Sequence, residues 1–139
     1  MEDLAVGQAA ELTRTVSAAD LDAFAAVTGD DNPLHLDETY AAATPFSGRI
    51  AHGMLAAGYI SAVIGTARPG PGGVYVSQTL RFRRPVRIGD AVTARVEITA
   101  LDEKRSRVAL ATVCRVNGKA VVEGEAEVIV PRRDARGDR

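Results

Sequence analysis

The chain has 139 residues, a length that suits one domain with one hydrophobic core. Its 17 basic and 18 acidic side chains give a formal net charge of -1, which argues against a general affinity for nucleic acid or an anionic membrane. The single cysteine, Cys114, has no second cysteine with which to form an intramolecular disulfide or a zinc site.

The sequence also lacks the signals of membrane insertion and secretion. No apolar run approaches the length of a membrane-spanning helix, and the first ten residues have no basic end leading into an apolar block. We therefore expect a cytoplasmic protein. Aromatic residues make up only 4% of the chain, so its core must be built from Ala, Val, Leu and Ile.

Two helices are predicted in the first half. Residues 17–29 begin with Ser17 as a possible N-cap and Asp20 three residues later, a pattern that resembles a capping box. Gly29 can end this helix. The apolar positions at near-helical spacing are Leu21, Phe24 and Val27. Residues 52–65 ("HGMLAAGYISAVIG") are apolar around most of the helix circumference, which predicts a buried helix.

From Val74 onward the sequence alternates apolar and polar residues in four segments, which predicts an antiparallel sheet with one covered face. The apolar positions are Val74, Val76, Leu80 and Phe82; Val92, Val96 and Ile98; Val108, Leu110, Thr112, Cys114 and Val116; and Val122, Ala126, Val128 and Val130. Asn117-Gly118 predicts a hairpin between the third and fourth segments. A weaker early strand is expected at residues 10–16, and residues 132–139 are expected to form a frayed tail. These elements predict an α+β fold in which a long antiparallel sheet curls around the buried helix.

The stretch "TGDDNPLHLD" (28–37) and the stretch "RIAHGML" (49–55) contain both histidines of the chain. Ordinary structural roles are available for each residue. Asp30 after a glycine and Asn32 before a proline are typical turn residues, and His35 can be a structural histidine. His52 is more simply a helix-end or packing residue, and Ser61 can bond back to a helix carbonyl.

The ordered pattern nevertheless resembles the MaoC-like hydratases of the hot dog fold, in particular the (R)-specific enoyl-CoA hydratases. The resemblance rests on "FAAVTGDDNPLHLD", "RIAHGMLAAGYIS" and "LRFRRPVRIGDAVTARVEI", and it extends from about Ala18 to Val130. It implies a single MaoC-like domain over residues 1–139. It also implies hydration of a trans-2-enoyl-CoA to the (R)-3-hydroxyacyl-CoA, with no metal and no cofactor, since coenzyme A is part of the substrate. Asp31 departs from the family pattern and adds a negative charge beside the expected catalytic pair.

The resemblance also assigns site residues. It makes Asp30 and His35 the pair that holds the attacking water, a task that suits a carboxylate and an imidazole. The backbone N–H of Gly53 is expected to form an oxyanion hole for the thioester oxygen. Asn32 would orient the pair, and Ser61 and His52 would support the site.

Coenzyme A also needs contacts to its phosphates. The densest positive run supplies candidates in Arg81, Arg83, Arg84 and Arg87, although solvated strand charge is the ordinary explanation of each. The family places the acyl-thioester site at a subunit interface, so we expect a homodimer or a higher homo-oligomer.

Three other functions are compatible with such a chain. One is a dehydratase acting on carrier-protein-bound or branched acyl thioesters. Another is an acyl-CoA thioesterase of the hot dog fold, but the helix from Met54 to Gly65 lacks the acidic residue on which that chemistry usually relies. A noncatalytic acyl-CoA-binding subunit is the third, and the presence of both Asp30 and His35 counts against it.

Overall fold

The computed structural model describes residues 3–131. Strand β1 (Ala9–Thr15) is followed by three short helices, α1 (Ala18–Thr28), α2 (Pro33–Leu36) and α3 (Glu38–Ala42), and by the longer helix α4 (Gly53–Thr66). The remaining strands are β2 (Val74–Gln78), β3 (Arg81–Phe82), β4 (Ala91–Asp102), β5 (Arg107–Val116) and β6 (Lys119–Ile129). The weak early strand, the two predicted helices (α1 and α4) and the later strands are all present, and the structure adds the short helices α2 and α3.

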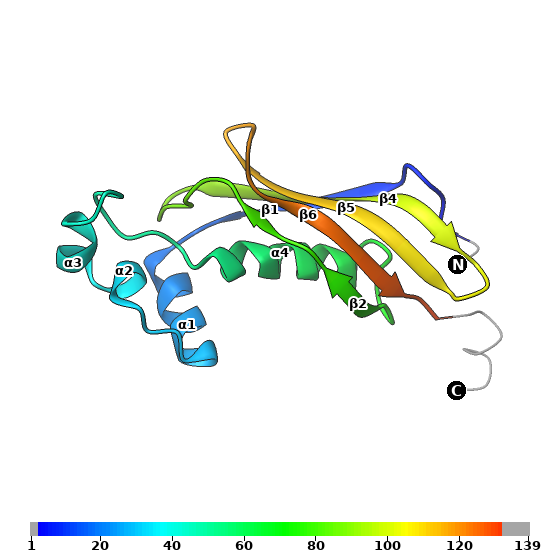
Figure 1. Ribbon diagram of the computed structural model, residues 1–139, viewed down its shortest axis with the longest axis horizontal. Coiled ribbons are helices and arrows are strands. Elements are labelled where there is room, and N and C mark those ends of the chain that lie inside the picture. The colour runs from blue at the N-terminus through cyan, green and yellow to red at the C-terminus, as the bar shows by residue number, and fades with distance from the viewer. Residues whose placement is uncertain (1–2, 132–139) are drawn as a thin grey trace.

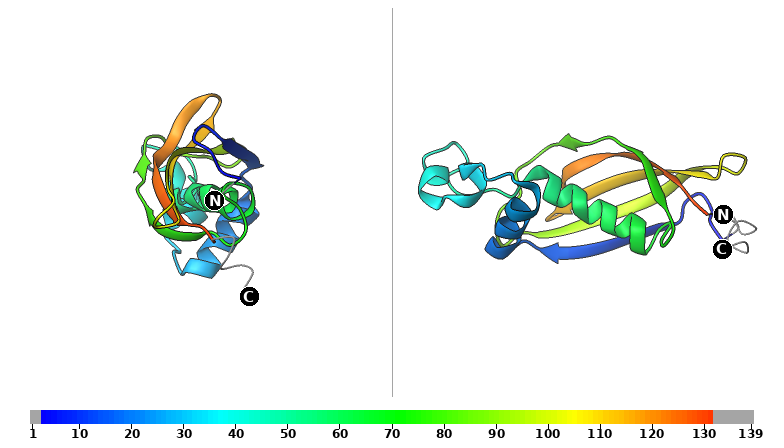
Figure 2. Two further views of the ribbon diagram at one scale, coloured as in Figure 1. Left: turned by 90° about the vertical axis from the view of Figure 1, so that its right-hand side faces the viewer. Right: turned by 90° about the horizontal axis from the view of Figure 1, so that it is seen from below.

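The strands form one antiparallel sheet in the order β1-β4-β5-β6-β2, with β3 paired to β6. Helix α4 runs along one face of this sheet, and the sheet curls around it (Figures 1 and 2). Helices α1, α2 and α3 gather beyond one end of the sheet (Figure 1). The predicted α+β hot dog arrangement is therefore confirmed.

Helix α1 begins and ends as its sequence predicts. The Ser17 hydroxyl accepts a hydrogen bond from the Asp20 backbone N–H (3.2 Å), and the Asp20 carboxylate accepts one from the Ser17 N–H (2.9 Å). Gly29 ends the helix in the left-handed conformation, with φ of 81°. Val27 shares the helical spacing of Leu21 but is 87% exposed, because this helix buries only the side that carries Leu21 and Ala25.

Helix α4 supplies the centre of the core, as its apolar sequence predicts. Ile60, Val63 and Ile64 are buried beneath the inward-facing residues of β4, β5 and β6. Cys114 is buried there too, and its thiol lies 3.4 Å from the Ala56 carbonyl oxygen. Burial raises the pKa of this thiol to about 12. The thiol is therefore a core group rather than a reactive one.

The strand predictions hold for β4, β5 and β6 and fail in part for β2 and β3. Asn117 (φ 51°) and Gly118 (φ 78°) form the predicted hairpin turn. The segment from Val74 to Phe82 is not one strand with a covered apolar face, because its register against β6 shifts between Tyr75 and Ser77. The apolar side chains left exposed are Val74 (61%), Val76 (40%) and Phe82 (55%).

Two further expectations concern the ends of the chain and the membrane. The predicted tail at 132–139 lies outside the described residues. Within residues 3–131, no helix is long and apolar enough to cross a membrane.

Candidate active site

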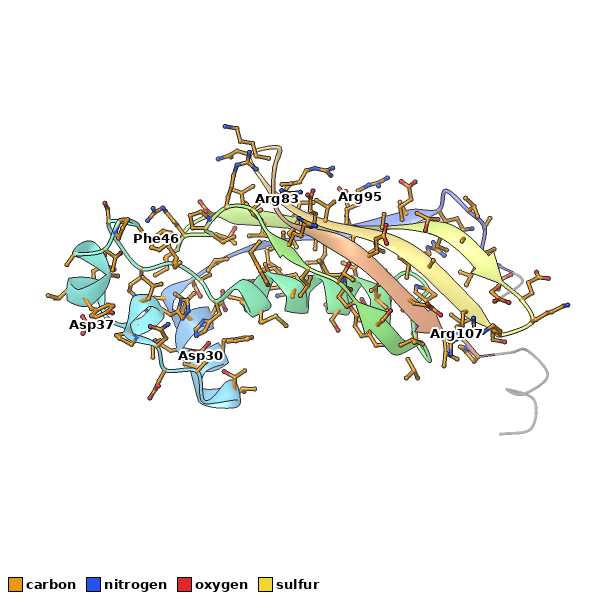
Figure 3. All side chains as sticks on the ribbon, viewed as in Figure 1. Asp30, Asp37, Phe46, Arg83, Arg95 and Arg107 are labelled. Atoms are coloured by element: carbon orange, nitrogen blue, oxygen red, sulfur yellow. The ribbon has the colours of Figure 1, made fainter. Side chains whose placement is uncertain are left out.

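The loop after α1, which includes the four-residue helix α2, carries Asp30 and His35, the latter within α2. Figure 3 shows Asp30 among the short helices beyond the end of the sheet. Asn32 caps α2, since its side-chain oxygen accepts a hydrogen bond from the Leu34 N–H at 3.1 Å. The Asp30 carboxylate accepts a hydrogen bond from the Asn32 N–H at 3.3 Å. Asn32 therefore shapes the backbone between the two predicted catalytic residues.

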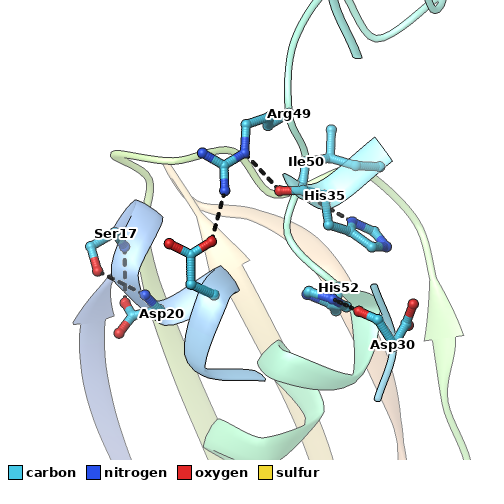
Figure 4. Close-up of polar contacts among 8 residues, drawn as sticks. Ser17, Asp20, Asp30, His35, Arg49, Ile50 and His52 are labelled. Carbon is cyan, nitrogen blue, oxygen red and sulfur yellow. Dashed lines mark hydrogen bonds and ion pairs between the residues drawn. The ribbon is translucent and has the colours of Figure 1, made fainter. Parts of the chain in front are cut away.

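The imidazole of His35 is held by a backbone carbonyl. Its Nδ1 lies 2.7 Å from the carbonyl oxygen of Ile50, a distance that requires Nδ1 to carry the hydrogen in the neutral ring (Figure 4). Nε2 is then the nitrogen that can accept a hydrogen bond. This tautomer suits a ring that takes a proton from a water molecule.

His52 is the most deeply placed polar residue of the site. Its side chain is 2% exposed, and its Nε2 lies 3.0 Å from the Asp30 backbone carbonyl oxygen. The ring stacks on His35 with a centroid separation of 4.0 Å and contacts Phe24 at 4.6 Å. His52 thus lies at the start of α4 and packs there, and the structure adds its hydrogen bond to the Asp30 carbonyl.

Asp30, His35 and His52 each offer one potential ligand atom, and these atoms lie within 4.8 Å of one another. One water molecule that makes two hydrogen bonds of about 2.8 Å bridges atoms roughly 4.6 Å apart. The spacing therefore suits a water held between a carboxylate and an imidazole. Two histidines and a carboxylate are also a donor set that a divalent cation can use. Asp31, whose charge the sequence placed beside the pair, is exposed.

A cavity of about 580 Å³ adjoins this cluster. His35, His52 and Gly53 lie in its wall together with mostly apolar side chains, among them Phe46 and Phe82. Helix α4 begins at Gly53 without a side-chain hydrogen bond to its first N–H groups. The positive end of this helix therefore faces an apolar cavity next to the histidines, an arrangement that favours a developing negative charge.

The predicted basic residues divide into two groups. Arg83 and Arg84 line the cavity, whereas Arg81 and Arg87 do not. Arg83 is bonded to the Glu123 carboxylate at 2.6 Å. Arg84 donates a hydrogen bond to the Ala120 carbonyl oxygen at 2.5 Å and forms no ion pair with the residues that the structure describes.

Ser61 does not join the other predicted site residues. It is exposed on α4 and is not part of the cavity wall. Its hydroxyl neighbours Tyr75 on β2: burial raises the pKa of Tyr75, and the hydrogen bond with Ser61 acts in the opposite direction. Ser61 lies two turns along the helix from Gly53, so within one chain it is separated from the cavity wall, and its supporting role stays a prediction.

Two residues of the site were missed by sequence reasoning. Arg49 donates a hydrogen bond from its Nε to the His35 carbonyl oxygen at 2.7 Å. The Phe82 ring lies so close to Gly53 that a β-carbon added there would be 2.7 Å from one ring carbon. The isolated charge of Arg49, just before the apolar helix, was the signal available in the sequence.

A family model described as "MaoC like domain" matches residues 4–120. The chain belongs to the MaoC-like domain family. It is 54% identical over 132 residues to a Rhodospirillum rubrum protein named (R)-specific enoyl-CoA hydratase, covering 95% of this chain and 92% of that protein. It is 53% identical to a 3-hydroxybutyryl-CoA dehydratase of Methylorubrum extorquens, covering 96% of this chain and 85% of that protein.

Solved structures agree with this membership. An unliganded R-hydratase from Pseudomonas aeruginosa superposes with a TM-score of 0.90 at 50% identity, covering 95% of this chain and 85% of that one. An (R)-hydratase from A. caviae superposes with a TM-score of 0.91 at 45% identity, covering 94% of this chain and 100% of that one. The MaoC-like chain therefore has the hot dog fold of R-hydratases.

Proposed function

We propose that this protein is a hydro-lyase that adds water to a trans-2-enoyl-CoA and forms the (R)-3-hydroxyacyl-CoA. The observation that carries this proposal is that an imidazole and an open helix start line one apolar cavity, with the Asp30 carboxylate beside the imidazole. The high identity to proteins named as enoyl-CoA hydratase and hydroxyacyl-CoA dehydratase supports the reaction and its reversibility.

In the proposed mechanism, Asp30 and His35 hold the attacking water. The water oxygen forms a bond to C3 of the enoyl group, and a water proton passes to the pair. Electrons of the C2–C3 double bond move toward the thioester oxygen, where the Gly53 N–H stabilises the negative charge. A proton from the pair then reaches C2. The product carries the elements of one water, so the addition involves no net oxidation or reduction and needs no redox cofactor.

Substrate binding uses the cavity and its basic rim. The apolar side chains accommodate the acyl group and exclude water from the reacting carbons. Arg84 is the stronger candidate for a coenzyme A phosphate, because Arg83 is already paired with Glu123. Arg81 and Arg87 lie outside the cavity wall and are weaker candidates.

The protein is also proposed to be a homodimer. Strand β2 is an edge of the sheet, and its exposed side chains include Val74 and Val76. An exposed apolar edge strand offers unpaired backbone groups to another strand, and a second copy of β2 can cover it. Light scattering at micromolar concentration should give twice the chain mass, and a monomer mass would contradict the proposal.

Two further expectations from the sequence stay predictions: that the chain forms a single MaoC-like domain, and that the protein is cytoplasmic.

The reaction is tested by following the enoyl-thioester absorbance with crotonyl-CoA and with longer trans-2-enoyl-CoAs. The proposal would be supported by loss of this absorbance without release of free thiol. The product should also co-elute with the (R)-3-hydroxyacyl isomer on chiral chromatography. Release of free coenzyme A would instead indicate a thioesterase. Binding of butyryl-CoA without turnover of any enoyl thioester would indicate a noncatalytic subunit, and turnover only of carrier-protein thioesters would indicate the alternative dehydratase.

A further inference from the structure

The segment from Arg49 to His52 runs beside the loop that carries the catalytic pair and is bonded to it at three points (Figure 4). The Arg49 Nε donates to the His35 carbonyl oxygen at 2.7 Å. The His35 Nδ1 donates to the Ile50 carbonyl oxygen at 2.7 Å. The His52 Nε2 donates to the Asp30 carbonyl oxygen at 3.0 Å. Both predicted catalytic residues are thus tied to one short segment.

This segment is itself fixed to the body of the protein. The Ala51 N–H donates to the Val86 carbonyl oxygen at 2.7 Å, and Ile50 forms a bridge with Arg87. Ala51 and His52 are buried, whereas Asp30 is exposed and α2 has only four residues. A short exposed loop has little packing of its own to fix its position. Its geometry therefore depends on the segment beside it.

Arg49 is placed to act on His35 rather than on a ligand. Its side chain is only 14% exposed, and its ion pair with Asp22 is long at 3.5 Å and involves a carboxylate that is 69% exposed. The shortest contact of the guanidinium is the hydrogen bond to the His35 carbonyl. A charged donor makes a stronger hydrogen bond than a neutral one, so this contact is the main link between Arg49 and the loop.

His52 holds the other end of the pair. The ring is enclosed by Phe24 and His35, and its Nε2 is directed at the Asp30 carbonyl. Its buried Nδ1 has no hydrogen-bond partner among residues 3–131. The ring therefore contributes one directed hydrogen bond and a flat surface against which the His35 imidazole rests.

We propose that Arg49 and His52 are positioning residues that set the separation and orientation of Asp30 and His35 during hydration. Arg49 is not part of the cavity wall, and His52, which is part of it, acts on the pair through its hydrogen bond to the Asp30 carbonyl. This inference rests on the proposed roles of Asp30 and His35. A misplacement of about 1 Å at reacting groups lowers a rate by roughly 100-fold, so loss of either hydrogen bond should appear in kcat.

The test compares two pairs of variants. Arg49→Met removes the donor and keeps the length of the side chain, whereas Arg49→Lys keeps the charge. His52→Leu removes the donor, whereas the amide nitrogen of His52→Gln can still reach the Asp30 carbonyl. For each variant, kcat and KM for crotonyl-CoA, the Kd of the unreactive butyryl-CoA and the thermal midpoint are measured.

We expect Arg49→Met and His52→Leu to lower kcat by about 10- to 100-fold. The Kd of butyryl-CoA should be unchanged in Arg49→Met, and in His52→Leu, whose ring lines the cavity, it should change by much less than kcat. Arg49→Lys should lose less than Arg49→Met, and His52→Gln should recover most of the activity lost in His52→Leu. Asp22→Ala is the matched control: it removes the ion pair, keeps the Nε hydrogen bond, and should leave kcat unchanged.

Three results would overturn the inference. Full kcat in Arg49→Met or His52→Leu would show that the hydrogen bond does not position the pair. Equal losses of kcat in His52→Gln and His52→Leu would show that the hydrogen-bond donor at position 52 is irrelevant. This comparison stays informative if His52→Leu is partly unfolded, because His52→Gln keeps a donor. A weakened Kd for butyryl-CoA that accounts for the whole effect would make the residue a substrate contact. The inference also requires that Asp30 and His35 are catalytic. If they were not, Asp30→Asn or His35→Ala would keep full activity, a result that differs from the three above.

Discussion

Replacement of Gly53 by alanine is the sharpest test of the oxyanion hole. The change adds one methyl group at the first residue of α4, in the wall of the cavity beside His52. The N–H group itself is kept. Any effect on turnover must therefore come from the space that the methyl group occupies.

The structure sets the size of the disturbance. A β-carbon at position 53 would lie 2.7 and 2.8 Å from two carbons of the Phe82 ring. Carbon atoms in contact prefer about 3.5 to 4.0 Å, so the ring must move by roughly 1 Å. Phe82 is 55% exposed and has room to move. The gain of about 1 kcal/mol in helix propensity of alanine over glycine offsets part of the strain, so stability should change little.

Turnover should change much more than stability. Both the methyl group and the displaced ring intrude on the place where the thioester oxygen must approach the Gly53 N–H. Loss of one oxyanion-hole donor lowers kcat by about 100- to 1000-fold, which sets the upper range for Gly53→Ala. We expect a fall in kcat of roughly 100-fold with crotonyl-CoA.

The assay measures the hydration rate and the thermal midpoint of three variants side by side. Gly58→Ala is the matched control, since it lies in the same helix and its added β-carbon would meet no atom within 4 Å. This control should keep full activity. In the double variant Gly53→Ala/Phe82→Leu, the smaller side chain should relieve the strain without restoring the rate.

Three outcomes would refute the reasoning. An unchanged rate in Gly53→Ala would remove this N–H from the oxyanion hole. Full recovery of activity in the double variant would show that Gly53 serves only the packing of Phe82. A rate loss matched by the fraction of unfolded protein would lead to the same conclusion.

Three further predictions address the rest of the site and the core. Asp30→Asn and His35→Ala should each lower hydration by at least about 100-fold in a folded protein, and near-normal turnover of either would remove that residue from the mechanism. Arg84→Ala should raise KM for crotonyl-CoA more than Arg81→Ala does, because only Arg84 lines the cavity; equal effects would contradict a specific phosphate contact. Because burial raises the pKa of Cys114 to about 12, its thiol stays protonated at pH 9, and iodoacetamide should label it only after unfolding. Rapid labelling of the native protein would show that this thiol is accessible.

The sequence by itself determined the local elements whose signals lie within a few residues of one another. The capping box of Ser17 and Asp20, the glycine that ends α1 and the Asn117-Gly118 turn all formed as predicted. The covered face of β4, β5 and β6 followed from period-two alternation. These features depend on neighbouring residues and on the burial of one face, and both can be read along the chain.

The sequence was a weaker guide where a side chain depends on its position in the sheet. Val74 and Val76 alternate like core residues, yet they lie exposed on an edge strand whose register shifts. The alternation of a strand shows which residues share a face, and it does not show whether anything covers that face. The direction of the Ser61 side chain was equally unreadable from the sequence, since only the packing of α4 on the sheet turns it toward Tyr75 of β2.

Only the tertiary structure decided how the catalytic pair is held. The hydrogen bonds of Arg49 to His35, of His35 to Ile50 and of His52 to Asp30 join residues 14, 15 and 22 positions apart. In two of them the acceptor is a backbone carbonyl of the loop, at His35 or Asp30. In the third the His35 side chain is the donor and the carbonyl of Ile50 is the acceptor. A carbonyl is present at every residue, so no residue type in the sequence marks the acceptor. The path of the backbone, set when the sheet curls around α4, brings these groups within hydrogen-bonding distance.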